Sequence, residues 1–393
     1  MSLPTPIAQG KTHLEELQLD QAEALFRSLT TGEHSVLAWV WLGRTLMMKG
    51  DEEQGLQALQ QALKLDPKQA EALSLQGLHY IQLDNHEKAV ELLERSRSLA
   101  PELAMTHGNL AICYRELERL DDAEASARRS LELAPDDAQV HYELSHILAL
   151  QNRVEEAIHE ALRTLELNPL HLTATLTLGE VYQKAGQLEL AERIYQEGLR
   201  HNPQAHILRE FLAQLYLATQ RPLPAYNEAK ELAERRGTYD DLLRFGEVGI
   251  LNGEFEEAEK TYQQAIAQDE SRWEAYYNLG ELYFTATLLE QAEPLYRKAI
   301  ELCSTDFRPS NALGLLLLHR QQADEALNFL TQALELAPQQ LQPLFNMALC
   351  CEARDDYDNA HKFATIVKEM ASDDDPLHQE AVRLLQELEK ASS

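Results

Sequence analysis

Apolar residues recur three or four positions apart in short segments along this chain, and polar turns separate the segments. Residues 172–205 contain two such segments, each with small and aromatic residues on one helix face. The residues that share these faces are Leu178, Gly179 and Tyr182 in the first segment, and Ala191, Tyr195 and Gly198 in the second. Gly186 lies where the chain must turn, and Pro203 ends the second segment. The pattern predicts a helical hairpin that needs neighbours to bury its apolar face.

The same pattern recurs with a period of 34 residues. Prolines stand at positions 67, 101, 135, 169 and 203, and they end the units 36–69, 70–103, 104–137, 138–171 and 172–205. Small residues recur at two matched places of these units. They are Gly43, Gly77, Ala111, Ser145 and Gly179 at the eighth place, and Gly55, Ala89, Ala123, Ala157 and Ala191 at the twentieth. The chain is therefore built from internal repeats rather than from ordinary domains.

This order of large and small residues resembles the tetratricopeptide repeat, a 34-residue helix-turn-helix unit. Two units carry its signature most fully: Trp39, Leu42, Gly43, Leu46, Gly55, Leu59 and Pro67 in one, and Tyr276, Leu279, Gly280, Tyr283, Ala292, Tyr296 and Ala299 in the other. The resemblance implies an all-α fold, a right-handed α-solenoid superhelix of about eleven repeats with a C-terminal capping helix. It also implies a concave groove lined by the first helix of each repeat.

The repeat pattern predicts five regions along the chain. They are a degenerate N-terminal repeat or cap (1–35), five regular repeats (36–205), an irregular repeat (206–238), four further repeats (239–374), and a capping helix and tail (375–393). Pro4 and Pro6 are expected to disturb the first helix, and Pro222 and Pro224 predict a delayed or distorted helix start. The region 206–238 is either a worn repeat that still stacks or a flexible joint between two blocks.

The last helix is expected to follow the acidic residues 373–375 and to extend through about residue 390. Four apolar residues are expected to face the stack, namely Ala381, Leu384, Leu385 and Leu388. Its opposite face is polar, as the end of an open solenoid requires for solubility.

Composition and charge narrow the function classes. The chain has 35 basic and 65 acidic residues, a net charge of −30, which argues against nucleic acids and anionic membrane surfaces as partners. A basic or amphipathic protein segment fits this charge better. The four cysteines are too few for a disulfide framework and are expected to be apolar residues within helices. The beginning of the sequence lacks the pattern of a secretory signal, and no stretch reaches membrane-spanning length, so a cytoplasmic protein is expected.

No catalytic or cofactor motif rises above background. The chain contains no H-E-x-x-H, no glycine-rich phosphate loop and no G-x-S-x-G. His141 and His146 are five residues apart, a spacing that does not place two imidazoles on one helix face, and adjacent Cys350 and Cys351 are a poor metal pair. The sequence therefore predicts a protein that is not an enzyme and binds no cofactor or metal.

The resemblance also implies which side chains line the groove, because the second, fifth, sixth, ninth, twelfth and thirteenth places of each first helix face it. The predicted partner-binding residues are Trp41, Arg44, Met48, Leu78, Asn109, Arg115, Tyr142, His146, Glu180, Lys184, Arg244, Glu247, Tyr277, Asn278, Glu281 and Asn346. No three neighbouring repeats supply the lysine, arginine and asparagine set that binds chaperone tails in this family. An asparagine ladder is at best fragmentary, because only Asn109, Asn278 and Asn346 occupy its place.

The leading functional prediction is a non-catalytic adaptor that binds a peptide segment or helix of a partner protein in the concave groove. The alternative is an assembly scaffold that acts through its ends or convex face, including self-association. In that case Trp41, Met47 and Met48 would form an interface rather than a ligand site. The partner and the pathway do not follow from the sequence.

Overall fold

The computed structural model describes residues 5–391, and this part of the chain forms twenty-three helices and no strands, which confirms the all-α prediction. The helices are α1 (Thr5–Glu15), α2 (Leu19–Ser28), α3 (Ser35–Met48), α4 (Glu52–Leu65), α5 (Ala70–Gln82), α6 (His86–Leu99), α7 (Ala104–Glu116), α8 (Leu120–Leu133), α9 (Ala138–Leu150), α10 (Val154–Leu167), α11 (Leu172–Lys184), α12 (Leu188–His201), α13 (His206–Ala218), α14 (Pro222–Arg235), α15 (Tyr239–Leu251), α16 (Phe255–Gln268), α17 (Glu274–Thr285), α18 (Leu289–Leu302), α19 (Arg308–His319), α20 (Ala323–Leu336), α21 (Leu341–Ala353), α22 (Tyr357–Met370) and α23 (Pro376–Ala391).

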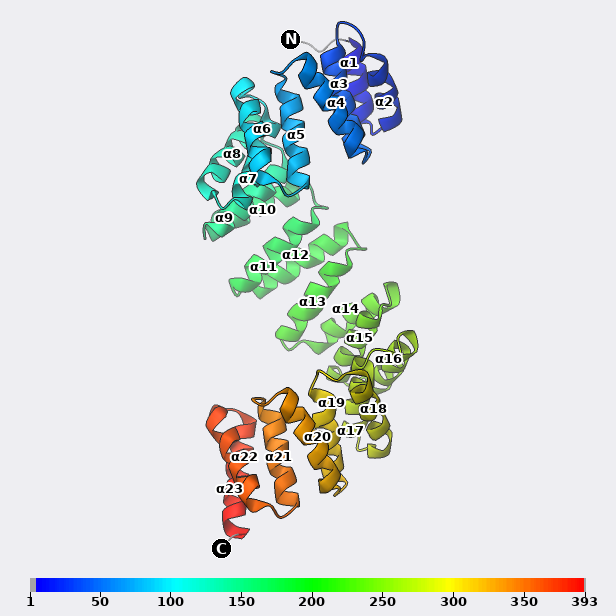
Figure 1. Cartoon of the computed structure of the whole chain (residues 1–393), viewed down its shortest axis with the longest axis vertical. Coiled ribbons are helices and arrows are strands. Elements are labelled where there is room, and N and C mark those ends of the chain that lie inside the picture. The colour runs from blue at the N-terminus through cyan, green and yellow to red at the C-terminus, as the bar shows by residue number, and fades with distance from the viewer. Residues whose placement is uncertain (1–4, 392–393) are drawn as a thin grey trace. The chain divides into compact units, whose positions relative to one another are not determined.

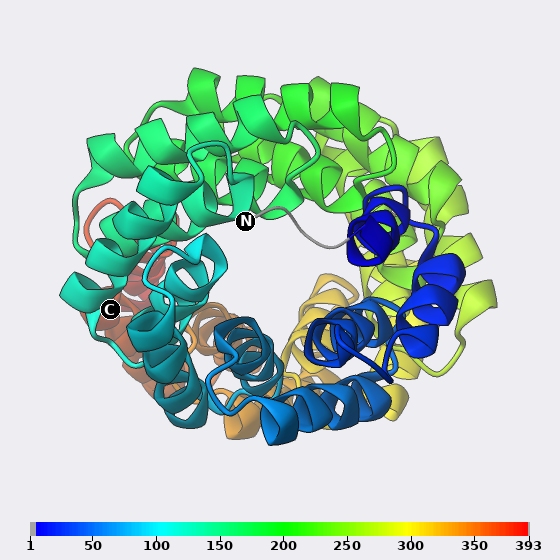
Figure 2. The ribbon, with the colours of Figure 1, turned by 90° about the horizontal axis from the view of Figure 1, so that it is seen from above.

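The chain divides into two compact units, residues 1–208 and 209–393. From α1 to α12, and again from α14 to α23, each helix packs on the next one along the chain (Figure 1). Odd-numbered helices, here called first helices, also pack on one another, as α3, α5, α7 and α9 do. Seen from above, successive pairs within each unit follow a curved path (Figure 2). Each unit is therefore a stack of helix pairs.

Six of the helix pairs share a close contact between the eighth and twenty-fourth places of the repeat. In six repeats a glycine on the first helix lies against a large side chain on the second: Gly43–Leu59, Gly77–Leu93, Gly179–Tyr195, Gly246–Tyr262, Gly280–Tyr296 and Gly314–Leu330. A Cβ atom added at Gly179 would lie 2.2 Å from Cε1 of Tyr195. Tyr195 is fully buried, so its ring takes the space that a larger residue at position 179 would need. The helical hairpin predicted for residues 172–205 is therefore confirmed, with its two helices in close contact.

The turn between paired helices has a common conformation that is largely independent of the residue that adopts it. The fifteenth place has a positive φ between 56° and 85° in ten repeats, at Gly50, Asp84, Glu118, Asn152, Gly186, Gln220, Gly253, Thr287, Gln321 and Asp355. The next amide donates to a carbonyl five residues earlier, as Gln187 does to Tyr182 at 2.8 Å and Leu288 to Tyr283 at 2.8 Å. This is the Schellman pattern of helix ends. Gly186 suits it without strain, whereas Thr287, being β-branched, adopts it at a cost.

The expectation of a delayed or distorted helix start at Pro222 and Pro224 is wrong. Helix α14 begins at Pro222 itself, with Pro224 in its first turn, and Pro6 lies in the first turn of α1. The first amides of a helix have no partner within it, so a proline there loses no hydrogen bond. Pro4 lies outside the described residues. Pro294 lies in the interior of α18, which continues through it.

Helix α23 closes the stack of the second unit as predicted. Ala381, Leu384 and Leu388 are buried in the same apolar cluster as residues of α19 to α22, and Leu385 packs against that cluster. Within residues 5–391, no helix is long and apolar enough to cross a membrane.

The contact between Gly179 and Tyr195 predicts that two glycine-to-alanine substitutions change the free energy of unfolding in opposite directions. Gly179→Ala is expected to lower the free energy of unfolding by about 1–3 kcal/mol, because the new methyl group overlaps the ring. Gly249→Ala, also within a first helix, should raise it by about 0.5–1 kcal/mol, because alanine favours helix. Atoms near that Cβ lie no closer than 3.6 Å. Urea denaturation followed by circular dichroism measures both, and equal shifts would contradict the steric argument.

Candidate partner-binding surface

Three successive first helices of the first unit bring aromatic and polar side chains together. The ring of Tyr142 on α9 lies 4.8 Å from that of His171, which caps α11, and 6.3 Å from that of His146. Arg115 on α7 donates from Nε to Glu143 on α9 at 3.1 Å. Burial raises the pKa of Tyr142 and lowers those of His146 and His171. We call Arg115, Tyr142, His146 and His171 the α9 cluster; all four are partly exposed.

The predicted residues nearest the N-terminus are mostly used in packing. Trp41 is buried and stacks on Phe26 at 6.3 Å, and the guanidinium of Arg44 lies 5.3 Å from the tryptophan ring. Arg44 also approaches Glu71 to 4.0 Å, although burial still raises the pKa of that carboxyl. Leu78 is half-buried, and Met48 is exposed. Of these residues, Met48 offers the most accessible apolar surface.

Two of the three predicted asparagines bond to neighbouring helices. Asn278 donates to Glu247 at 2.9 Å, and Asn346, which is buried, donates to Asn311 at 2.9 Å. Asn109 is also buried, and its Nδ2 has no hydrogen-bond partner among the described residues. These amides link adjacent first helices in the second unit rather than forming an open ladder.

Helices α17 and α19 gather a second aromatic group. The ring of Tyr277 lies 5.9 Å from that of Trp273 and 6.2 Å from that of Tyr296. The guanidinium of Arg308 lies 4.9 Å from the Trp273 ring. Tyr296 donates its hydroxyl hydrogen to Glu281 at 2.5 Å, and burial raises the pKa of Glu281.

The remaining predicted residues differ in exposure. Lys184 is exposed, whereas Glu180 and Arg244 are half-buried. None of these three forms an ion pair within the part of the chain that the structure describes. The whole predicted set stays a prediction of the groove.

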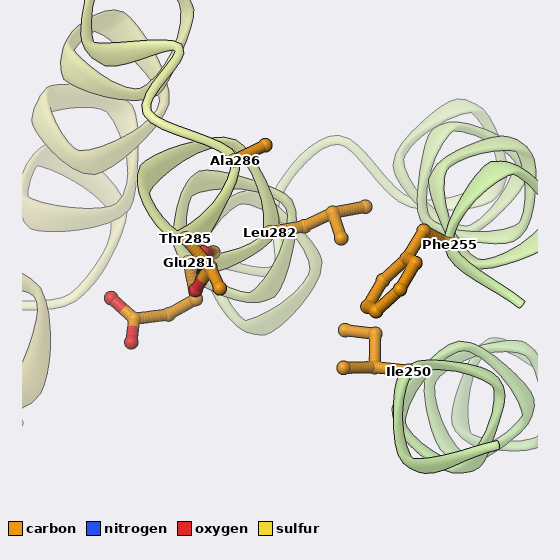
Figure 3. A pocket seen from close by; sticks show the side chains of 6 residues that line it. All are labelled: Ile250, Phe255, Glu281, Leu282, Thr285 and Ala286. Carbon is orange, nitrogen blue, oxygen red and sulfur yellow. Dashed lines mark hydrogen bonds between the residues drawn. The ribbon is translucent and has the colours of Figure 1, made fainter. Parts of the chain in front are cut away.

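An apolar cavity of about 410 Å³ lies between α15, α16 and α17. Ile250, Phe255, Glu281, Leu282, Thr285 and Ala286 line it (Figure 3). Of these lining residues, only Glu281 is among the partner-binding residues predicted from the sequence. Two signals were present: Ile250 occupies a groove-facing twelfth place, and Phe255 is an aromatic residue at the start of a second helix. Neither signal shows that the space between them is empty.

No group of three or more potential metal ligands occurs in residues 5–391. Cys113, Cys350 and Cys351 are buried, and burial raises the pKa of Cys113 to about 12 and of Cys350 to about 11, so these thiols are poor nucleophiles. Cys303 is half-buried and follows the last residue of α18, outside the helix.

Stacked helix pairs of one recurring length define the α-solenoid class of repeat proteins. Family models for the tetratricopeptide repeat match residues 36–69, 68–136, 109–170, 176–240, 252–307 and 308–340, well over half of the sequence. The chain belongs to the tetratricopeptide repeat family. Repeats of this family are protein-interaction modules and are typically non-catalytic.

Solved structures with a similar fold include yeast Tom70, with 14% identity over 99% of this chain and 95% of its own and a TM-score of 0.46. MamA has 22% identity over 40% of this chain and 93% of its own, with a TM-score of 0.36. The Cut9–Hcn1 hetero-tetramer of the APC/C has 13% identity over 96% of this chain and 89% of its own, with a TM-score of 0.46. A comparison with curated proteins gave no match. The family assignment therefore depends on the repeat matches.

The environment of Glu281 predicts a pH-dependent effect on stability. Burial raises the pKa of Glu281 in the folded chain. At pH values between the unfolded and the folded pKa, the folded state therefore keeps a proton that the unfolded state has lost. Burying the ionised carboxylate lowers the stability of the fold. This loss of stability is absent below the unfolded pKa of about 4.3 and complete above the folded pKa. Glu281→Gln should therefore raise the urea midpoint at pH 7, and this gain should shrink as the pH falls toward about 4.

Glu247→Gln is the matched control, since Glu247 occupies the same ninth place of the preceding repeat but is exposed. Both replacements keep an oxygen that can accept the hydrogen bond from Tyr296 or Asn278. Glu247→Gln should leave the midpoint unchanged across this pH range. A gain for Glu281→Gln that is independent of pH would show that burial of its charge is not the cause.

Proposed function

We propose that this chain is a non-catalytic adaptor that holds an extended or helical segment of a partner protein on the face formed by its first helices. The observation that supports this most directly is the α9 cluster. Its side chains come from α7, α9 and the N-cap of α11, and they leave tyrosine, histidine and arginine partly exposed. Aromatic residues and arginine are enriched where proteins bind one another.

The second-helix faces of the same unit make a less suitable binding surface. Arg128 and Arg153 pair with Glu124 and Glu156 across α8 and α10, with N–O distances from 2.6 to 3.5 Å. Arg163 likewise bridges α10 and the turn before α9 by pairing with Asp136 at 2.9 Å. A partner that bound there would have to compete with these pairs. The first-helix face of this unit offers the partly exposed rings of Tyr142, His146 and His171 instead.

The adaptor proposal predicts that binding depends on the α9 cluster. The probe is a phage-displayed library of random peptides, selected on the full-length chain, with dissociation constants then measured for the enriched peptides. Tyr142→Ala and His146→Ala should each weaken binding, Tyr142→Ala by about tenfold or more, as loss of a central aromatic contact does.

His159→Ala is the matched control, because His159 is 80% exposed on the second helix of the same repeat. It should leave the dissociation constants unchanged. If no peptide is enriched, or if the enriched peptides bind both first-helix variants as tightly as the wild type, the proposal is wrong.

A further inference from the structure

The cavity between α15, α16 and α17 is lined at its base by the buried side chain of Leu282 and at its rim by exposed residues. Leu282 is buried in a core cluster with Ala258, Tyr262 and Leu279, so the base belongs to the packed interior of the repeat. Figure 3 shows Leu282 pointing toward Ile250 and Phe255, while the Glu281 carboxylate points away from them. Phe255 is the first residue of α16 and is 52% exposed. A large ring beside an empty apolar space leaves apolar surface in water.

The size of the cavity suits a side chain rather than a single water molecule. Its volume of about 410 Å³ lies within the roughly 300–1,000 Å³ of pockets that bind small ligands. Thr285 and Ala286 are exposed, so the cavity opens to the surface at the C-terminal end of α17. An inserted apolar group would cover both Leu282 and the ring of Phe255.

Three exposed carboxylates stand close in the sequence to two residues that line the cavity, Ile250 and Phe255. Glu254 and Glu256 stand on either side of Phe255 in the sequence, and Glu247 lies one helical turn before Ile250. None of these three forms an ion pair within residues 5–391. Glu257, by contrast, pairs with Lys260 at 3.7 Å. These exposed carboxylates near the cavity favour a ligand that carries positive charge beside its apolar group.

We infer that this cavity binds one apolar side chain of a partner segment in which lysine or arginine residues flank that side chain. The inference rests on the proposed adaptor function and names the chemistry of the partner. The apolar group supplies burial against Leu282 and Phe255, and the cations meet Glu247, Glu254 and Glu256. A second copy of this chain is a poor occupant, because two molecules of net charge −30 repel each other.

Two substitutions test the cavity without removing its core residues. Ala286→Trp places a large ring at an exposed rim position, and Phe255→Ser removes the exposed ring. Tyr357→Ser is the matched control, because Tyr357 is the first residue of α22 and is 38% exposed. Circular dichroism and urea midpoints are measured first, so that only folded variants are compared. Peptides selected from the random library on the wild-type chain are then titrated against each variant by fluorescence anisotropy.

The enriched peptides should carry a leucine, isoleucine, methionine or aromatic residue flanked by lysine or arginine. Ala286→Trp and Phe255→Ser should each weaken them by about tenfold or more, whereas Tyr357→Ser should change affinity by less than about twofold. Replacing Glu254 and Glu256 by glutamine should reduce the salt dependence of binding, since surface charges act over about one Debye length.

Two outcomes would overturn the inference and leave the adaptor function standing. In one, the peptides lose affinity with Tyr142→Ala but bind both cavity variants like the wild type. In the other, peptides with acidic flanks bind as tightly as those with basic flanks. Peptides that depend on neither surface would overturn both proposals. A dimer in light scattering that dissociates in Phe255→Ser would make a second copy the occupant, which also overturns the inference.

Discussion

The contact between the eighth and twenty-fourth places is the constraint on which six of the helix pairs depend. A glycine at the eighth place lets the second helix approach until a leucine or tyrosine covers its backbone, as Tyr195 covers Gly179. The buried rings of Tyr195, Tyr262 and Tyr296 supply much of the apolar burial in their repeats. Because one pair buries too little surface to fold alone, its stability also depends on the pairs stacked on either side.

The fold was largely predictable from the sequence, because this contact recurs at fixed spacing and leaves a periodic signal. What the period does not show is where backbone geometry overrides residue preference. Thr287 adopts φ 61° although threonine disfavours it, because the helix-ending hydrogen bond from Leu288 to Tyr283 sets the turn. Pro222 and Pro224 suggested a disturbed helix, yet first-turn prolines cost no hydrogen bond, so α14 begins without delay.

The candidate site was less predictable. The place of a residue in the repeat indicates which way its side chain points, but not how deeply it is buried or how much empty space lies beside it. Trp41, Asn109 and Asn346 occupy groove-facing places and are nevertheless buried, since neighbouring helices cover them. The cavity could not be predicted from the sequence either, because it is a space that no side chain fills. It exists because Ala286 and Thr285 leave space beside Leu282 and Phe255, and an unfilled space between three helices has no one-dimensional pattern.

Residues at the same place of two repeats can differ in their electrostatic environment. Glu247 and Glu281 share the ninth place, but Glu281 is held by the Tyr296 hydroxyl in a buried setting that raises its pKa. Glu247 is exposed and accepts from Asn278. A cationic ligand therefore gains more from Glu247, Glu254 and Glu256 at the surface than from Glu281, whose burial favours the neutral form. The repeat determines where a carboxylate points, whereas the neighbouring helices determine how much charge it presents to a partner.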